Sequence, residues 1–155
     1  MKIKLLCVGA VREAGIATAI DVYTRRIPHY WPFSMVCIPD VKGARDQRSQ
    51  KALEGARILA ETAPGDFLML LDERGKRYTS RAWAEFLQRK SVELPRTLIL
   101  AIGGPYGFSK EVYDRSDAMI SLSDMTFPHE LVRLFAVEQI YRAGTIVRGE
   151  PYHHD

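Results

Sequence analysis

Two uninterrupted apolar runs of strand length, residues 67–71 and 98–102, constrain the fold of this chain most strongly. A strand that is apolar at every position is covered on both faces, as in the parallel sheets of α/β proteins. Residues 3–8 and 33–38 are also rich in β-branched and leucine residues, and residues 118–120 form a shorter apolar segment. The sequence therefore predicts a buried sheet, not a sheet with one solvated face.

Between these runs, apolar residues recur every three or four positions, which is the period of an amphipathic helix. The first expected helix has the apolar face Ala19, Ile20, Tyr23 and Ile27 and ends before Pro28, and the second has the face Ala52, Ala56, Leu59 and Ala60. The third begins at an N-cap at Ser80 and has Trp83, Phe86 and Leu87 on one face, and the short fourth helix follows a cap at Ser109 and includes Val112 and Tyr113. The last helix covers residues 129–143 and is ended by Gly144. We also expect a loop at residues 72–76 and an interruption at Pro95.

Strands that alternate with helices indicate an α/β domain with a mainly parallel sheet and helices on both faces. A chain of 155 residues is typical of one domain, so residues 1–155 are expected to form a single unit. Ligands of such sheets bind outside the carboxyl ends of the strands. Three loops follow predicted strands in this way, and they begin near Leu71, Gly103 and Ser121.

Composition and charge limit the classes of partner and the cellular compartments that suit this chain. Its 22 Lys and Arg against 19 Asp and Glu give a net charge of +3, which permits a nucleic-acid partner without requiring one. Two cysteines are too few for a disulfide framework and favour a reducing cytoplasm. The amino-terminal apolar run is too short for a membrane span and lacks a cleavage site. We therefore expect a cytoplasmic protein that is not embedded in a membrane.

The loop Gly103-Gly104-Pro105-Tyr106-Gly107 is the first candidate site. Glycines at a strand end allow positive φ and close approach of the backbone to a ligand, although a tight turn needs the same freedom. The spacing matches neither the dinucleotide fingerprint nor the P-loop. Pro105 removes a backbone N–H, so an uncharged moiety such as adenosine suits this loop better than phosphate.

Further candidates follow in the last third of the chain. The hydroxyl-rich stretch 121–129 either forms part of a site or caps the last helix. That helix is apolar on more than one face, which is typical of a dimer interface or of a central core helix. The tail carries Arg142, Tyr152 and His153, which either fray or order over a site. The adjacent His153 and His154 lack metal-ligand spacing, so no metal is expected.

A basic segment, containing Lys42, Arg45, Arg48, Lys51 and Arg57, precedes and enters the second helix. It either contacts phosphates or is a solvated helix face.

Taken together, the motifs of the last third resemble the RlmH family, and the resemblance extends over the whole chain. The motifs are Gly103–Gly107 as written above, Ser121-Leu-Ser, Met125-Thr-Phe-Pro-His129, Leu131-Val-Arg133, Glu138-Gln-Ile-Tyr-Arg-Ala143 and Pro151-Tyr-His-His154. This resemblance implies a SPOUT-class methyltransferase with a trefoil-knotted fold that works as a homodimer. It also implies methyl transfer from S-adenosylmethionine to N3 of a pseudouridine in 23S ribosomal RNA. The modest net charge of +3 favours recognition of an assembled ribosome surface over naked RNA.

The resemblance further implies roles for particular residues. The cofactor-binding positions are Leu71, Gly103, Gly104, Gly107, Leu122, Ser123, Asp124, Met125, Thr126 and Phe127. Arg142, Tyr152 and His153 are the expected catalytic residues, which stabilise charge, contact the base and accept the proton. His129, Arg133 and His154 are the expected substrate contacts. The alternatives are a non-catalytic ribosome- or nucleotide-binding α/β protein and an enzyme that acts on small-molecule nucleotides, such as a hydrolase.

Overall fold

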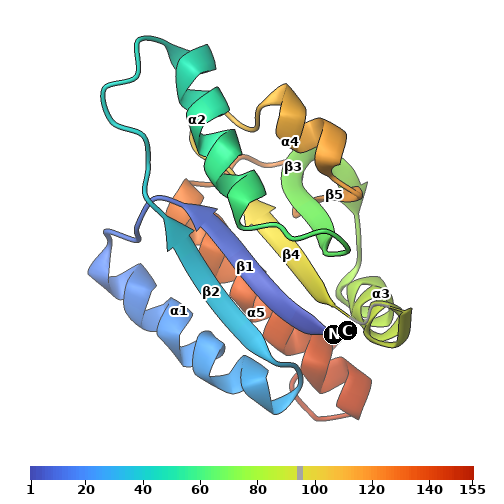
Figure 1. Ribbon diagram of the computed structural model, residues 1–155. Coiled ribbons are helices and arrows are strands. Elements are labelled where there is room, and N and C mark those ends of the chain that lie inside the picture. Colours follow the sequence, from blue (N-terminus) through green and yellow to red (C-terminus); the bar gives the residue numbers. More distant parts are fainter. Residues whose placement is uncertain (94–95) are drawn as a thin grey trace.

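The computed structural model describes residues 1–93 and 96–155, so the interruption expected at Pro95 lies outside the described residues. Within them, five strands form one parallel sheet in the order β2-β1-β4-β3-β5 (Figure 1). The strands are β1 (Lys2–Val8), β2 (Phe33–Ile38), β3 (Phe67–Arg77), β4 (Thr97–Ile102) and β5 (Ala118–Ser121). This arrangement confirms the predicted α/β class with a parallel sheet.

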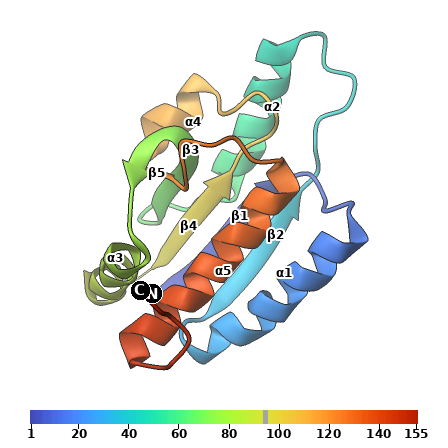
Figure 2. The same cartoon turned by 180° about the vertical axis from the view of Figure 1, so that it is seen from behind.

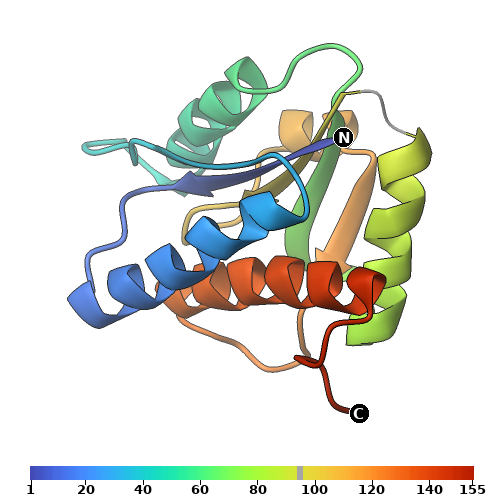
Figure 3. The same ribbon diagram turned by 90° about the horizontal axis from the view of Figure 1, so that it is seen from below.

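The helices cover both faces of the sheet, as predicted. They are α1 (Ala14–Arg26), continued by a 3-10 turn (Ile27–His29), then α2 (Gln47–Ala60), α3 (Ser80–Glu93), α4 (Lys110–Arg115) and α5 (His129–Arg148). Figure 3 shows α1, α3 and α5 on one side of the sheet, with α2 and α4 on the other. None of the helices in the described parts of the chain is long and apolar enough to cross a membrane.

Alternation along the strands explains why they are apolar throughout. In β1, Ile3, Leu5 and Cys7 pack with α1, α3 and α5, whereas Leu6 and Val8 pack with α2 and α4. Successive side chains of a strand point to opposite faces, and here both faces are core. The continuous apolar runs of β3 and β4 have the same cause.

The loop expected at residues 72–76 is wrong, because β3 continues to Arg77. Lys76 and Arg77 pair with Ile120 and Ser121 of β5, after a register shift that begins at Leu71. Gly75 makes this pairing possible, since a Cβ there would lie 2.4 Å from a backbone atom of Ile120. The charged, largely exposed residues 73–77 around Gly75 resemble a loop when only the sequence is read.

The expected end of the last helix at Gly144 is also wrong. The helix continues to Arg148 and ends at Gly149, whose φ is +69° in the left-handed region. Gly144 instead lies under the ring of Tyr30, and a Cβ there would come within 2.4 Å of that ring. Gly144 therefore allows α5 to pack closely against the residue that follows the 3-10 turn.

The expected face of α2 needs correction as well. The buried residues are Glu54, Gly55 and Ile58, whereas Ala52 and Ala56 are exposed. Gly55 allows α2 to lie close to α4, because a Cβ there would lie 2.4 Å from the Ser109 hydroxyl. Alanine carries little information about burial, so a pattern of three alanines and one leucine predicted the wrong face.

The buried faces of α3 and α4 agree with the prediction, but the caps do not. Trp83, Phe86 and Leu87 are buried on α3, and Thr79 accepts a hydrogen bond of 3.1 Å from the Ala82 amide in the role expected of Ser80. Ser109 precedes α4 without forming a side-chain cap hydrogen bond.

Candidate functional site

The carboxyl ends of β3, β4 and β5 surround a cleft of about 850 Å³. Its walls come from three segments: the end of the apolar half of β3, the glycine loop 103–107, and the loop 121–127 that leads into α5. All ten predicted cofactor positions line it, namely Leu71, Gly103, Gly104, Gly107, Leu122, Ser123, Asp124, Met125, Thr126 and Phe127. The volume is in the range of small-molecule and cofactor sites. The structure therefore brings these residues together, while their binding role stays a prediction.

The glycine loop forms a tight turn, and its glycines serve different ends. Gly107 has φ +79° and donates a 3.1 Å hydrogen bond from its amide to the Gly104 carbonyl. Gly103 and Gly104 have ordinary φ but lack space for a side chain. A Cβ on Gly103 would meet the Phe108 ring at 3.2 Å, and one on Gly104 would meet the Glu54 carboxylate at 2.4 Å. The glycines of this loop therefore both form a tight turn and allow close packing of the cleft wall.

The loop 121–127 is held by its own hydroxyl groups. Ser121 Oγ donates to the Ser123 carbonyl at 3.1 Å, and Ser123 Oγ accepts from the Met125 amide at 3.0 Å. Phe127 packs edge-on against Phe135 of α5, with ring centroids 5.1 Å apart. The hydroxyls thus shape the loop and do not cap α5, which begins without a side-chain cap hydrogen bond.

Asp72, Arg74 and Tyr113 also line the cleft, and no role was predicted for any of them individually. Tyr113 donates to Asp72 Oδ2 at 2.5 Å, and Arg74 Nε donates to Asp72 Oδ1 at 3.1 Å. Burial opposes ionisation of Asp72, but these hydrogen bonds lower its pKa overall. The Arg74 guanidinium also lies 4.7 Å from the centre of the Tyr113 ring. The sequence signal was the position of residues 72–74 directly after an apolar strand.

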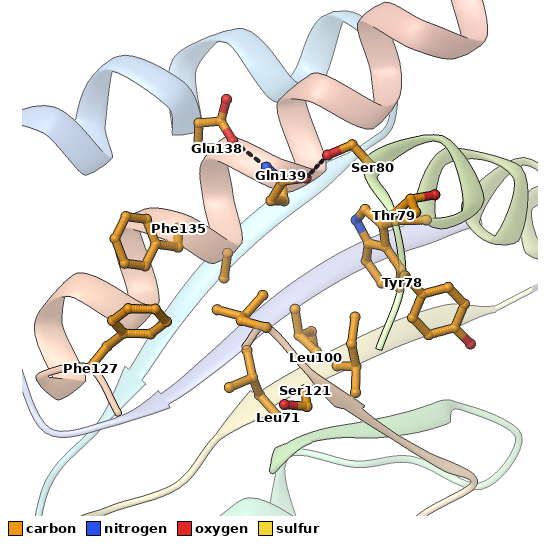
Figure 4. Close-up of a pocket in the computed structure, with 14 residues that line it drawn as sticks. Leu71, Tyr78, Thr79, Ser80, Leu100, Ser121, Phe127, Phe135, Glu138 and Gln139 are labelled. Carbon is orange, nitrogen blue, oxygen red and sulfur yellow. Dashed lines mark hydrogen bonds between the residues drawn. The ribbon is translucent and has the colours of Figure 1, made fainter. Parts of the chain in front are cut away.

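A smaller pocket of about 290 Å³ adjoins the cleft between α3 and α5 (Figure 4). The two cavities share Leu71, Ser121, Leu122 and Phe127. Its polar edge is a chain of hydrogen bonds, in which Ser80 Oγ donates to Gln139 Oε1 and Gln139 Nε2 donates to Glu138, both at 2.9 Å. The loop 121–127 therefore separates a large polar cleft from a small, mostly apolar one.

The three predicted catalytic residues meet on α5 and the tail. Arg142 donates to Glu138 Oε1 through Nε at 2.9 Å and Nη2 at 2.6 Å. The Tyr152 hydroxyl donates to the same oxygen at 3.0 Å, and the Arg142 guanidinium lies 4.7 Å from the centre of the Tyr152 ring. Burial, with the neighbouring Tyr23 and Glu138, raises the pKa of Tyr152. Glu138 is thus the common anchor of this cluster.

His153 completes the cluster, and both of its ring nitrogens are engaged. Nδ1 lies 3.2 Å from Arg142 Nη1, and Nε2 lies 2.8 Å from Asp155 Oδ1. Asp155 also accepts from Arg81 Nε of α3 at 2.7 Å. The hydrogen bonds from Arg81 and His153 lower the pKa of Asp155 to about 2. The tail is therefore docked on α3 and α5 in this structure, while His154 is exposed.

The tail cluster lies farther along α5 than the part of that helix that lines the cleft. α5 starts at the carboxyl edge of the sheet and runs back toward the amino ends of the strands (Figure 2). With a rise of 1.5 Å per residue, Arg142 lies about 20 Å along the helix from His129. In the described parts of the chain, Tyr152 and His153 line neither the cleft nor the smaller pocket. One protomer therefore does not place its own tail at its own cleft.

His129 and Arg133 stand in different positions, although both were expected to contact substrate. His129 lines the cleft at the start of α5, where partial desolvation and the Arg133 charge lower its pKa. Arg133 is only 3% exposed and donates to the Val8 and Gly9 carbonyls at 2.6 and 2.8 Å. Its guanidinium joins α5 to the end of β1 and offers no surface to RNA.

No group of three or more His, Cys, Asp or Glu with metal-site geometry occurs in residues 1–93 and 96–155.

Comparisons with known proteins relate this fold and cleft to one family. The family model described as "Predicted SPOUT methyltransferase" matches residues 1–153. Proteins named ribosomal RNA large subunit methyltransferase H are 47% identical in Christiangramia forsetii, over 99% of both chains, and 46% identical in Parabacteroides distasonis, over 100% of both. The solved structure of a probable methylase family protein from Haemophilus influenzae shares the fold, with a TM-score of 0.55 at 11% identity over 99% of this chain and 70% of its own. The chain belongs to the SPOUT methyltransferase family.

Proposed function

We propose that this protein transfers a methyl group from S-adenosylmethionine to N3 of a pseudouridine in 23S ribosomal RNA, acting on the assembled ribosome in the cytoplasm. The observation that carries the proposal is the convergence on one cleft of the middle of β3 with the two loops that follow β4 and β5. The names of the full-length relatives support the ribosomal substrate. Membership of a methyltransferase family favours an enzyme over the two alternatives left open by the sequence.

The residues of the cleft fit the proposed cofactor. Gly103 and Gly104 present bare backbone, and the loop 121–127 adds hydroxyl and apolar groups beside it. Such a wall suits a neutral nucleoside better than a phosphate, because Pro105 lacks an N–H to donate. We propose that these two loops hold the nucleoside and that Leu71 packs against it. When bound, S-adenosylmethionine supplies an activated methyl group, so the protein mainly aligns it with the attacking nitrogen.

The tail residues suit the chemistry at the target base. Methylation at N3 forms an N–C bond, breaks the S–C bond of the donor and releases the N3 proton. We assign Arg142 to stabilise the negative charge that develops on the base and Tyr152 to contact the ring. If His153 Nε2–H donates to Asp155, the free lone pair is on Nδ1, which faces Arg142. His153 Nδ1 is therefore the proposed proton acceptor once RNA displaces the Arg142 contact.

The distance between cleft and tail supports a homodimer. The docked tail does not line the cleft of its own chain, and Arg142 lies about 20 Å along α5 from His129, so a second copy is the simplest source of a tail at the cleft. Apolar side chains near the cleft are exposed, with Met125 at 75% and Phe135 at 38%. We propose that the first half of α5 and the loop before it form the interface, and that the tail of one copy completes the cleft of the other.

Two measurements test this function. Calorimetric titration is expected to show binding of S-adenosylmethionine, and no binding at millimolar ligand would contradict the proposal. Methyl incorporation is then compared among intact ribosomes, isolated large subunits and free 23S RNA. We expect intact ribosomes to be methylated best. Faster methylation of naked RNA would contradict the assignment of an assembled substrate.

A further inference from the structure

Glu54 is a buried carboxylate directly behind the glycine loop. It lies on α2 and is only 2% exposed. Oε1 accepts a 3.0 Å hydrogen bond from Gln50 Nε2, whereas Oε2 is buried without a partner in the described residues. Glutamate is almost never fully buried unless it is paired, and an orphaned buried oxygen calls for an explanation.

The orphaned oxygen faces the wall of the cleft. A Cβ on Gly104 would lie 2.4 Å from Glu54 Oε2, so the carboxylate occupies the space that a side chain would take. Gly104 itself lines the cleft. One layer of backbone therefore separates the carboxylate from a ligand in the cleft. Charges at such short range, away from bulk water, are weakly screened by salt.

The other acidic groups around the cleft are paired or solvated. Asp72 is bound by Arg74, Asp124 is bound by Arg77, and Glu73 is exposed. Arg133 is a buried cation in this region; its Nη1 and Nη2 donate to the Gly9 and Val8 carbonyls, and its Nε has no partner in the described residues. Glu54 forms no ion pair within 4.0 Å among residues 1–93 and 96–155. Its partner is a single neutral amide, which leaves a negative site behind the loop.

We propose that Glu54 determines ligand specificity, by favouring the cationic methyl donor over its neutral product. This inference rests on the proposed function. When the methyl group leaves, the electron pair of the broken S–C bond stays on sulfur, and the sulfonium becomes a neutral thioether. The net charge of the cofactor falls by one, and the attraction to Glu54 falls with it. Glu54 thereby helps the product to leave after each transfer.

The test compares two ligands on two variants. Titration calorimetry of Glu54→Gln is expected to show a Kd for S-adenosylmethionine raised about tenfold, equivalent to about 1.4 kcal/mol. The Kd for S-adenosylhomocysteine is expected to stay near that of the wild type, which also shows that the cleft is intact. Glu61→Gln makes the same chemical change at the end of the same helix, where the carboxylate pairs with Lys4. We expect it to leave the ratio of the two Kd values unchanged.

Equal weakening of both ligands by Glu54→Gln would overturn the inference, as would no change in either. A second measurement uses the wild-type protein, in case the variant does not fold. An analogue with a protonated amine in place of the sulfonium is expected to bind more tightly than S-adenosylhomocysteine, and equal affinity would contradict the inference. If the wild type binds neither S-adenosylmethionine nor its product, the proposed function itself fails, which is a different result.

Discussion

At the scale of single residues, the identity of distant neighbours decides what each side chain does. The stretches that follow apolar strands can be read locally, and the ten cofactor positions implied by the family resemblance all line one cleft, although their binding role stays a prediction. Glu54 and Arg133 could not be read in this way. No sequence signal pointed to Glu54, and Arg133 was predicted to contact RNA, yet both are buried against residues far away in the chain, Gly104 and the end of β1. Burial of a charged side chain is a tertiary property that local periodicity does not encode.

Gly104 gives the sharpest prediction at this scale. Gly104→Ala is expected to lower the free energy of unfolding by about 1–3 kcal/mol, because its Cβ would overlap the Glu54 carboxylate. In a Glu54→Ala background the same substitution is expected to cost much less, since the space is then free. Urea denaturation of the four proteins in this double-mutant cycle measures the coupling.

Gly15 at the start of α1 is the matched control, since a Cβ there would meet nothing within 4 Å. Gly15→Ala is expected to leave stability unchanged or to raise it slightly. An additive cycle between positions 54 and 104 would contradict the packing described for the glycine loop.

At the scale of secondary-structure elements, the presence of each helix and strand was easier to predict than the residues at which it begins and ends. The apolar half of β3 was readable, but its polar half depends on Gly75 and on pairing with β5. The end of α5 was predicted wrongly because Gly144 is a glycine that packs against Tyr30 and does not end the helix. The local sequence pattern does not reveal this contact. The tail is the clearest case, since its order comes from Arg81 on α3 and Glu138 on α5.

Docking of the tail has a testable pH dependence. Hydrogen bonds from Arg81 and His153 lower the pKa of Asp155 to about 2, from an ordinary value of about 3.9. A lowered carboxyl pKa stabilises docking above the ordinary value, and this contribution is lost as the pH falls toward 2. NMR titration of the Asp155 carboxyl carbon is expected to give a midpoint near 2 in the wild type.

Arg81→Gln is expected to move that midpoint up toward the ordinary value, because one of the two donors is lost. A midpoint that is already ordinary in the wild type would show that the tail is not docked in solution.

At the scale of the whole molecule, strand order and threading lie beyond a local reading of the sequence. Parallel strands with helical crossovers are compatible with several orders, and β2-β1-β4-β3-β5 became known only from the structure. The trefoil knot stays a prediction from the family resemblance. The separation of cleft and tail is likewise a property of the whole domain, because it depends on the direction in which α5 crosses the sheet (Figure 2).

The most direct measurement of the central claim is methyl transfer by mixed dimers. Thr126→Trp fills the cleft with a bulky ring from an exposed loop position, and Tyr152→Ala removes the ring of the tail. Each variant alone is expected to be inactive on ribosomes, with Tyr152→Ala keeping normal affinity for S-adenosylmethionine. If the tail of one copy serves the cleft of the other, equal mixing after subunit exchange restores about a quarter of wild-type activity, since half of the dimers then hold one intact site. No recovery in demonstrated heterodimers would contradict the proposed shared site.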